Sequence, residues 1–145
     1  MFSQQISEVM EQNMLLTAPP NTTVLEAAEL MENQKVGAVM VMEQEKIVGI
    51  FTERDAVFRV IARNCDVHST LLSDVMTKSP QTIESDKTFG YALLVMYENS
   101  FRHLPVLENG KLVGMVTARS ALDPDMDEFL SETERRKRIL GERTK

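Results

Sequence analysis

The chain has 145 residues, of which 43% are hydrophobic and 26% are charged, as expected for one globular domain that buries a core. Its formal net charge of −6 argues against broad binding to nucleic acid or to an anionic membrane, and no apolar stretch reaches the roughly 20 residues of a membrane-spanning helix. A single cysteine, Cys65, leaves no internal disulfide, and the first residues lack a secretory pattern, so we expect a cytoplasmic protein.

The first half of the chain predicts four main elements after a short helix and an extended segment in residues 1–16. Two prolines hold the backbone extended near residue 20, and Thr23 with Glu26 forms the pattern of a helix-capping box. The expected elements are a helix to about Gln34, a buried strand at 36–42, a second strand at 46–51 after a short turn, and a helix at 53–64.

The second half repeats this order after a polar linker at residues 64–69. Asp86 or Thr88 can begin a helix that runs to Asn99. Residues 104–107 predict a strand, and Pro105 indicates either an edge strand or the beginning of a strand. The Asn109-Gly110 pair predicts a hairpin turn into a strand at 111–116, and a helix-like segment follows near Ala121.

The two halves are copies of one unit. Residues 111–120 match residues 46–55, which lie 65 positions earlier, and the one functional-looking mismatch is Asp55 against Ser120. A single unit of about fifty residues is too small to bury both a helix face and a sheet face, whereas two units related by a pseudo-twofold axis would share a core and form a cleft. The predicted fold is therefore α+β, with two tandem β-α-β-β-α repeats at residues 6–64 and 72–122.

Residues 123–145 lie outside the duplication. Acidic residues come first and basic residues last, which suits a helix dipole, but the apolar stripe is thin. The segment is interpreted as a docking helix, a dimer contact or a frayed tail. We expect it to contribute little to a ligand site.

Four short motifs occupy matching places in the duplication. They are Gly-Ile-Phe-Thr-Glu-Arg-Asp at 49–55, Asp-Val-Met-Thr at 74–77, Phe-Arg-His-Leu-Pro-Val at 101–106 and Gly-Lys-Leu-Val-Gly at 110–114. Each motif alone is weak. Together, over residues 6–122, they resemble a tandem pair of cystathionine-β-synthase (CBS) domains, also called a Bateman module.

The resemblance implies a ligand and a way of acting. Similar modules bind adenine nucleotides, or sometimes S-adenosylmethionine, between their repeats, pair into flat homodimers, and act as sensors rather than as catalysts. We therefore expect AMP or another adenine nucleotide as ligand, no required cofactor, a homodimer formed through the CBS helices, and a still unidentified effector protein. The apolar helix positions expected to be left over for the dimer contact are Phe58, Ala62, Met96 and Tyr97.

Other functions are weighed against this one. The chain could be a ligand-free structural or dimerisation module, for which Ser120 is the best argument, or it could bind S-adenosylmethionine or NAD. An enzyme is not expected, because two histidines and one cysteine are too few for a convincing catalytic or metal site. No phosphate-cradling glycine-rich loop is present either.

Thr52 and Asp55 are the first candidate ligand residues, with Arg54 between them. Their spacing equally predicts a capping box, with Thr52 as N-cap and Asp55 reaching back to a free backbone amide. The resemblance favours a second role, in which the Asp55 carboxylate accepts the two hydroxyls of a ribose. Thr52 would then hold sugar or phosphate beside the helix N-terminus. The two roles are compatible.

The remaining candidates come from both repeats. The resemblance implies that Arg102 and His103 contact phosphates, with a solvated arginine and a half-buried histidine as the alternative; their first-repeat counterparts are Gly37 and Ala38. Thr117, Arg119 and Ser120 would form a second cleft that is weaker, empty or differently occupied, because serine replaces the carboxylate, and Arg119 could compensate in part by binding phosphate. The resemblance places the base between Ile50 and Phe51 on one side and Thr82 and Ile83 on the other, with plain core packing as the alternative for these four.

Overall fold

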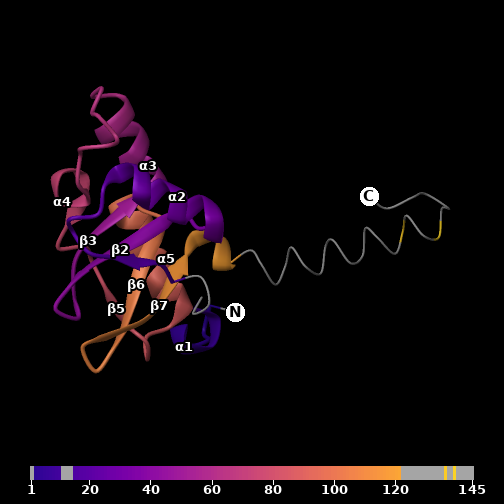
Figure 1. Ribbon diagram of the computed structural model, residues 1–145. Coiled ribbons are helices and arrows are strands. Elements are labelled where there is room, and N and C mark those ends of the chain that lie inside the picture. Colours follow the sequence, from indigo (N-terminus) through magenta and orange to yellow (C-terminus); the bar gives the residue numbers. More distant parts are fainter. Residues whose placement is uncertain (1, 11–14, 122–135, 137–138, 140–145) are drawn as a thin grey trace.

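The computed structural model of the protein describes residues 2–10, 15–121, 136 and 139 (Figure 1). Expectations about residues 123–145 therefore lie almost entirely outside the described residues. The helices are α1 (Ile6–Val9), α2 (Val24–Gln34), α3 (Glu53–Asp55), α4 (Leu72–Val75) and α5 (Phe89–Asn99), with a π-helix η1 (Ala56–Ile61) and a 3-10 helix η2 (Ala118–Ala121). The strands are β1 (Thr17–Ala18), β2 (Ala38–Glu43), β3 (Lys46–Thr52), β4 (Thr77–Lys78), β5 (Ile83–Glu84), β6 (His103–Glu108) and β7 (Lys111–Thr117). None of the described helices is long and apolar enough to cross a membrane.

Two sheets carry the fold, in the orders β1-β2-β3-β4 and β5-β6-β7. In each repeat a short strand pairs in parallel with the first hairpin strand, and the hairpin strands pair antiparallel. The register shifts at Val41/Met42 in β2 and again 65 positions later at Val106/Leu107 in β6. The α+β fold with two related repeats is confirmed.

The repeats exchange their first helices. The backbone N–H of Ile6 in α1 donates to Lys87 O at 2.9 Å, and the Ile6 side chain lies in the core of the second repeat. In the reverse direction, the N–H of Leu72 in α4 donates to Thr22 O at 2.9 Å, and Leu72 lies in the core of the first repeat. The helix α1, which begins the first repeat in sequence, therefore packs with the second repeat, and α4, which begins the second repeat in sequence, packs with the first.

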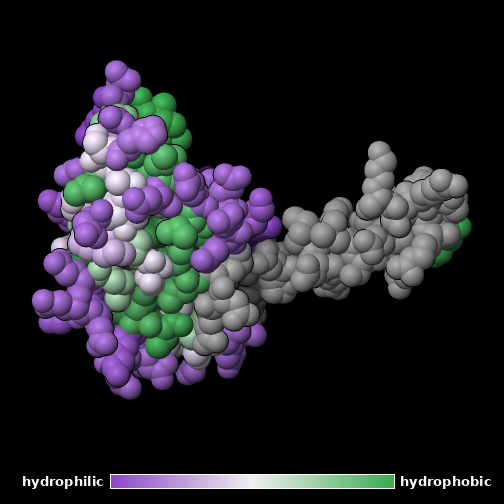
Figure 2. Space-filling view, in the orientation of Figure 1, coloured by the Kyte–Doolittle hydropathy of each residue, from purple (hydrophilic) through white to green (hydrophobic). Residues whose placement is uncertain are grey.

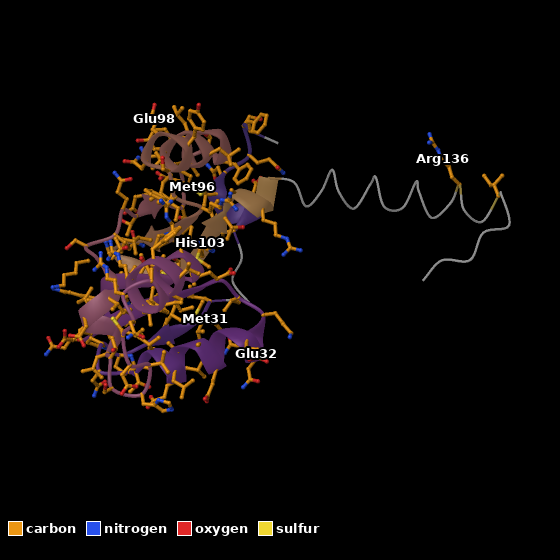
Figure 3. All side chains as sticks on the ribbon, turned by 90° about the horizontal axis from the view of Figure 1, so that it is seen from above. Met31, Glu32, Met96, Glu98, His103 and Arg136 are labelled. Carbon is orange, nitrogen blue, oxygen red and sulfur yellow. The ribbon has the colours of Figure 1, made fainter. Side chains whose placement is uncertain are left out.

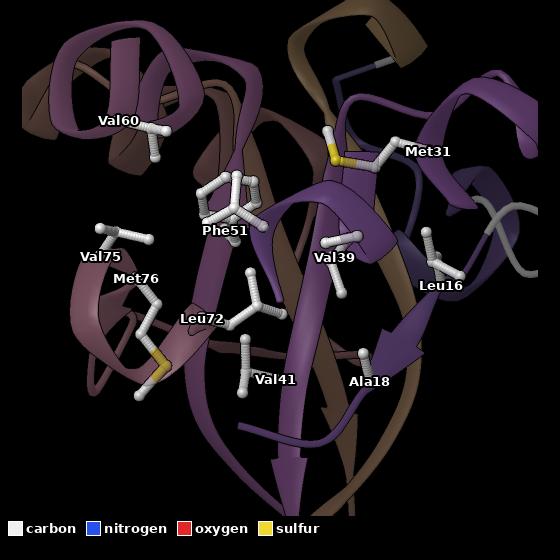
Figure 4. Packing of buried hydrophobic residues seen from close by; sticks show 12 residues of the cluster. Leu16, Ala18, Met31, Val39, Val41, Phe51, Val60, Leu72, Val75 and Met76 are labelled. Carbon is white, nitrogen blue, oxygen red and sulfur yellow. The ribbon is translucent and has the colours of Figure 1, made fainter. Parts of the chain in front are cut away.

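The buried side chains form three clusters. One packs α2, β2, β3 and η1 around Phe51 and Leu72 (Figure 4), and the second packs α5 against β6 and β7 around Phe89. The third joins the sheets through Ala38, Met40, Ile50 and Met115. Figure 3 shows the consequence: α2 and α5 lie on opposite sides of the molecule with the strands between them, Met31 and Met96 pointing inward and Glu32 and Glu98 outward.

Local signals locate most element boundaries. Thr23 and Thr88 cap α2 and α5, each accepting the N–H three residues later at 3.2 Å. Asn109 and Gly110 have φ of 53° and 79°, as expected for a tight hairpin turn. The helix predicted at 53–64 instead ends at Ile61, because its last part widens into π-type hydrogen bonds such as Ala62 N–H to Val57 O.

The strand containing Pro105 is not an edge strand, so the first of the two alternatives is wrong; Pro105 is the third residue of β6, near the beginning of the strand, as the second alternative has it. β6 lies between β5 and β7. β5 pairs only with Val106 and Leu107, one residue beyond Pro105, so the missing amide proton of the proline costs no ladder bond to β5.

Candidate ligand-binding cleft

Thr52 and Asp55 form the predicted capping box where β3 passes into α3. The Thr52 hydroxyl accepts the N–H of Asp55 at 3.3 Å, and Asp55 Oδ2 accepts the N–H of Thr52 at 2.9 Å. The Thr52 hydroxyl also lies 3.2 Å from Asp55 Oδ2. Both free amide groups at this helix start are therefore satisfied by local side chains.

The other oxygen of Asp55 faces groups from elsewhere in the fold. Oδ1 lies 3.5 Å from the Thr77 hydroxyl on β4 and 3.5 Å from Nε of Arg59, one helical turn further along. The residue is only 7% exposed. These two contacts are long, whereas the capping bond of Oδ2 is short, so Oδ1 is the atom with spare accepting capacity.

Arg59 connects the helix that carries Asp55 to the C-terminal end of α4. Its Nη1 donates to the carbonyls of Met76 at 2.9 Å and of Val75 at 3.3 Å, at the C-terminal end of α4. Cationic donors at that position complement the helix dipole and the unpaired carbonyls. Arg59 thereby fixes the chain that leads into Thr77 against the helix that carries Asp55.

A cleft of about 1170 Å³ opens beside Asp55 and is lined by both repeats. That volume is at the upper limit of ordinary small-molecule sites. The first repeat contributes Ile50, Thr52, Glu53, Arg54, Asp55, Phe58, Arg59 and Arg63, and the rest of the chain contributes Thr77, Ser79, Pro80, Gln81, Asn99, Ser100, Phe101, Arg102 and His103.

The cleft is cationic, although the chain as a whole is acidic. Four arginines line it against two carboxylates, Glu53 and Asp55. Arg54 reaches across to the Ser100 carbonyl at 3.4 Å and lies 5.5 Å from the centre of the Phe58 ring. Within the described part of the chain, the side chains of Arg63 and Arg102 make no hydrogen bond or ion pair. Two guanidinium groups are thus available to an anion in the cleft.

His103 stands in the middle of the molecule, between the layers of Figure 3, where β6 begins. Burial lowers the pKa of its ring, the nearby Glu53 carboxylate opposes that shift, and the Arg102 guanidinium adds to it. The ring is therefore neutral at pH 7, and one nitrogen can donate a hydrogen bond while the other accepts.

The cleft brings together six of the residues expected from the sequence: Ile50, Thr52, Arg54, Asp55, Arg102 and His103. Phe51 and Ile83 are corrections, because they are 0% and 5% exposed and pack in the first and second cores. Strand alternation explains the difference, since neighbours such as Ile50 and Phe51 must face opposite sides of a sheet. For these two residues the alternative of plain core packing holds.

Three further candidates lie elsewhere. Thr82 lines a smaller cavity of about 330 Å³ near the hairpin tips. Thr117 ends β7 opposite His103 and is buried, while Arg119 is exposed in η2. Neither Thr117 nor Arg119 lines the two cavities described here. On the opposite side of the pseudo-twofold, Ala38 is fully buried between the sheets, so the counterpart of His103 offers no polar group.

Sequence reasoning missed Glu53, Arg59, Arg63 and Thr77, all of which line the cleft. For two of them a signal existed: Asp55, Arg59 and Arg63 follow one another at intervals of four residues, which places them on one helix face. Thr77 had no comparable signal, because only the pairing of β4 with β3 brings it to Asp55.

Comparisons with known proteins agree with the geometry. The family model described as the CBS domain matches residues 6–62 and again residues 72–125. A CBS domain-containing protein of Arabidopsis thaliana is 37% identical over 108 residues, which cover 74% of this chain; the chain spans about a fifth of the length of that plant relative (20%).

Solved structures share the fold. An uncharacterized conserved protein from Pyrococcus horikoshii superposes with a TM-score of 0.80 at 29% identity, covering 86% of this chain and 94% of that one. A CBS domain pair in complex with 5′-methylthioadenosine and S-adenosyl-L-methionine superposes with a TM-score of 0.76 at 20% identity, covering 86% of this chain and 98% of that one. At the latter identity the likeness shows the fold alone.

Proposed function

The chain belongs to the CBS domain family, as a tandem pair that forms a regulatory module, and on this premise we propose that it senses an adenine nucleotide in the cleft beside Asp55. The observation that carries the proposal is the position of one buried carboxylate in a cleft with two unpaired guanidinium groups. A nucleoside phosphate needs both: acceptors for the sugar hydroxyls and donors for the phosphate.

The ribose is assigned to Asp55. Oδ2 keeps its 2.9 Å bond to the Thr52 amide, whereas Oδ1 has only two contacts of 3.5 Å. A ribose hydroxyl bound to Oδ1 at an ordinary distance would replace weak contacts by a stronger one. Capping and ligand binding therefore use different oxygens, and the same carboxylate can serve both.

The phosphates are assigned to the arginine side of the cleft. Arg102 enters from the second repeat and Arg63 from the end of the first-repeat helix, so a phosphate chain between them would be held by both repeats. His103 supplies a further donor. Charge-assisted bonds of this kind contribute about 1.5–3 kcal/mol each. A ligand bound in this way would couple the two halves of the module.

The ligand seen in a similar fold supports an adenosyl group in general. The CBS pair solved with 5′-methylthioadenosine and S-adenosyl-L-methionine holds two molecules that share adenosine with AMP and ATP. The four arginines around the cleft of this chain favour the phosphorylated members of that class over a sulfonium cation.

Isothermal titration calorimetry tests the proposal. Adenosine, AMP, ADP, ATP, NAD and S-adenosylmethionine are titrated into the full chain at one ionic strength, with GTP as the base control. We expect the phosphorylated adenine ligands to bind more tightly than adenosine and S-adenosylmethionine. Absence of heat from every adenine ligand at millimolar concentration would refute nucleotide sensing and leave the ligand-free structural module.

We also propose a homodimer formed through exposed helix faces. Figure 2 shows hydrophobic side chains in a broken band down one face of the molecule. The large exposed apolar side chains on helices are Leu30, Val57, Phe58, Ile61, Tyr91, Leu94 and Tyr97, at 37–84% exposure. The expectations for Phe58 and Tyr97 fit this surface, but Met96 is 2% exposed and belongs to the core. Ligand state would reach an effector protein through this dimer.

A further inference from the structure

Glu53 occupies a notch that Gly37 leaves open. Its backbone N–H donates to Gly37 O at 3.1 Å, and its side-chain carboxylate lies where a Cβ on Gly37 would be. The same Cβ would come within 3.3 Å of His103 Nε2. The absence of a side chain at position 37 therefore holds the Glu53 carboxylate close to the ring of His103, inside the ligand cleft.

Only the first repeat has this pairing of a glycine with a glutamate; the matching positions of the second repeat do not. At the second-repeat positions that match Gly37 and Glu53, 65 residues later, the chain has Arg102 and Ala118. The first repeat thus supplies the carboxylate and the notch, while the second supplies Arg102 and His103. These groups meet in a single cleft because the repeats face each other across the pseudo-twofold.

The charge of Glu53 lies at the start of α3 and acts on the nearby ring of His103, but no cation among the described residues neutralises it. The Asp55 carboxylate is accounted for by the helix cap and Arg59, but the Glu53 carboxylate makes no hydrogen bond or ion pair in the described part of the chain. It is exposed to the cleft. A negative charge left unpaired in a cleft for an anion must weaken that anion's binding, by an amount that grows with the ligand's charge.

We propose that Glu53 sets the phosphate preference of the cleft by penalising each additional phosphate group. This inference rests on the proposed nucleotide function and concerns which nucleotide, by number of phosphates, the cleft prefers. Any phosphate held by Arg102 and His103 lies near the Glu53 carboxylate, and the repulsion grows with the number of negative charges that the phosphate chain carries. Glu53 shifts the choice of ligand toward AMP without excluding ATP, because the arginines still outnumber the carboxylates.

The size of the effect follows from Coulomb's law. At a separation of about 7 Å and a dielectric response near that of water, one unit of ligand charge contributes roughly a factor of two to three in affinity, and salt reduces it further. Removing the charge of Glu53 should therefore tighten AMP, with about two negative charges, roughly fivefold, and ATP, with about four, roughly twenty-fivefold. The ratio of the two dissociation constants should change by roughly fivefold.

The test uses Glu53→Gln, which keeps the shape of the side chain and removes its charge. AMP, ADP and ATP are titrated without Mg²⁺ into the full-length wild type, Glu53→Gln and a matched control, Glu32→Gln, whose side chain points outward from α2 (Figure 3). We expect the ATP-to-AMP preference to rise about fivefold in Glu53→Gln only, and the rise to shrink at 0.5 M salt.

The outcomes separate the two proposals. Wild type that binds nucleotides with an ATP-to-AMP preference unchanged by Glu53→Gln would overturn the role of Glu53 and leave the nucleotide site standing. Equal tightening of AMP and ATP would also overturn it, because an electrostatic effect grows with the charge of the ligand, whereas a purely structural effect does not. Failure of the wild type to bind any adenine nucleotide would remove the proposed function and this inference together.

Discussion

Replacing Asp55 distinguishes a residue that only caps a helix from one that also holds a ribose. Asp55→Ala removes the acceptor of the Thr52 amide, and the loss of such a cap costs about 0.5–2 kcal/mol in the free energy of unfolding. For a chain of this size each kcal/mol corresponds to roughly 2–4 °C in melting temperature. The unliganded variant should therefore melt about 1–8 °C below the wild type.

The nucleotide response carries the decisive difference. Ligand at a hundred times Kd stabilises the wild type by about 2.7 kcal/mol, a rise of roughly 5–10 °C. Loss of a charged acceptor should weaken binding ten- to a hundredfold, which corresponds to about 1.5–3 kcal/mol. At the same ligand concentration the variant then keeps only about 0.4–1.4 kcal/mol of the stabilisation, so most of the melting shift disappears.

Asp55→Asn makes the test sharper. The amide oxygen can still accept the Thr52 N–H, so the cap survives, but the atom beside Thr77 and Arg59 becomes an uncharged donor that cannot accept a ribose hydroxyl. We expect a nearly unchanged melting temperature without ligand and a much reduced nucleotide shift. The assay is differential scanning fluorimetry of each variant against AMP and ATP.

A matched control comes from the start of α4. Asp74 accepts the N–H of Leu71 at 3.0 Å, as Asp55 accepts the N–H of Thr52, but Leu71 has no side chain that could complete a capping box, and Asp74 does not line the cleft. Asp74→Ala should lower the melting temperature and keep the full nucleotide shift. Ser120→Ala, at the sequence counterpart of Asp55, should change the nucleotide shift little. An undiminished nucleotide shift in Asp55→Ala and Asp55→Asn would refute the assignment of the ribose to this carboxylate.

Three further expectations concern pH, assembly and the last segment of the chain. Burial lowers the folded-state pKa of His103 below its ordinary 6.5, so the unfolded chain takes up a proton first and stability falls as pH drops through that value. Urea unfolding at pH 8.0 and 5.5 should therefore show a smaller loss in His103→Asn than in the wild type, and an equal loss in both would contradict the effect. Light scattering should give twice 16.4 kDa for the wild type and 16.4 kDa for Tyr97→Asp, because a charge at an 84% exposed aromatic position disrupts an apolar contact; a wild-type particle of 16.4 kDa at micromolar concentration argues against the dimer. Deletion of residues 123–145 should leave nucleotide affinity within a few-fold by calorimetry, whereas a hundredfold loss would show that this segment closes the cleft.

The sequence by itself determined the features that depend on neighbours three or four residues apart. The Thr52–Asp55 box, the caps at Thr23 and Thr88 and the Asn109-Gly110 turn are set by side-chain chemistry acting on the local backbone, and all occur as predicted. The duplication adds long-range information, because two copies of one unit imply a shared core and a cleft between them. The fold class could be predicted for this reason, together with part of the polar lining of the cleft, although Glu53, Arg59, Arg63 and Thr77 were missed.

Tertiary structure alone decided which candidates face the cleft. Ile50 and Phe51 are adjacent and equally apolar, but the stacking of two sheets turns one toward the cleft and buries the other against Leu72. Thr77 reaches Asp55 only through strand pairing, and Glu53 meets His103 only because Gly37 leaves space between repeats. Asp55 and Thr77 are 22 positions apart and Glu53 and His103 are 50 positions apart, so these partners are chosen by packing and not by any local pattern.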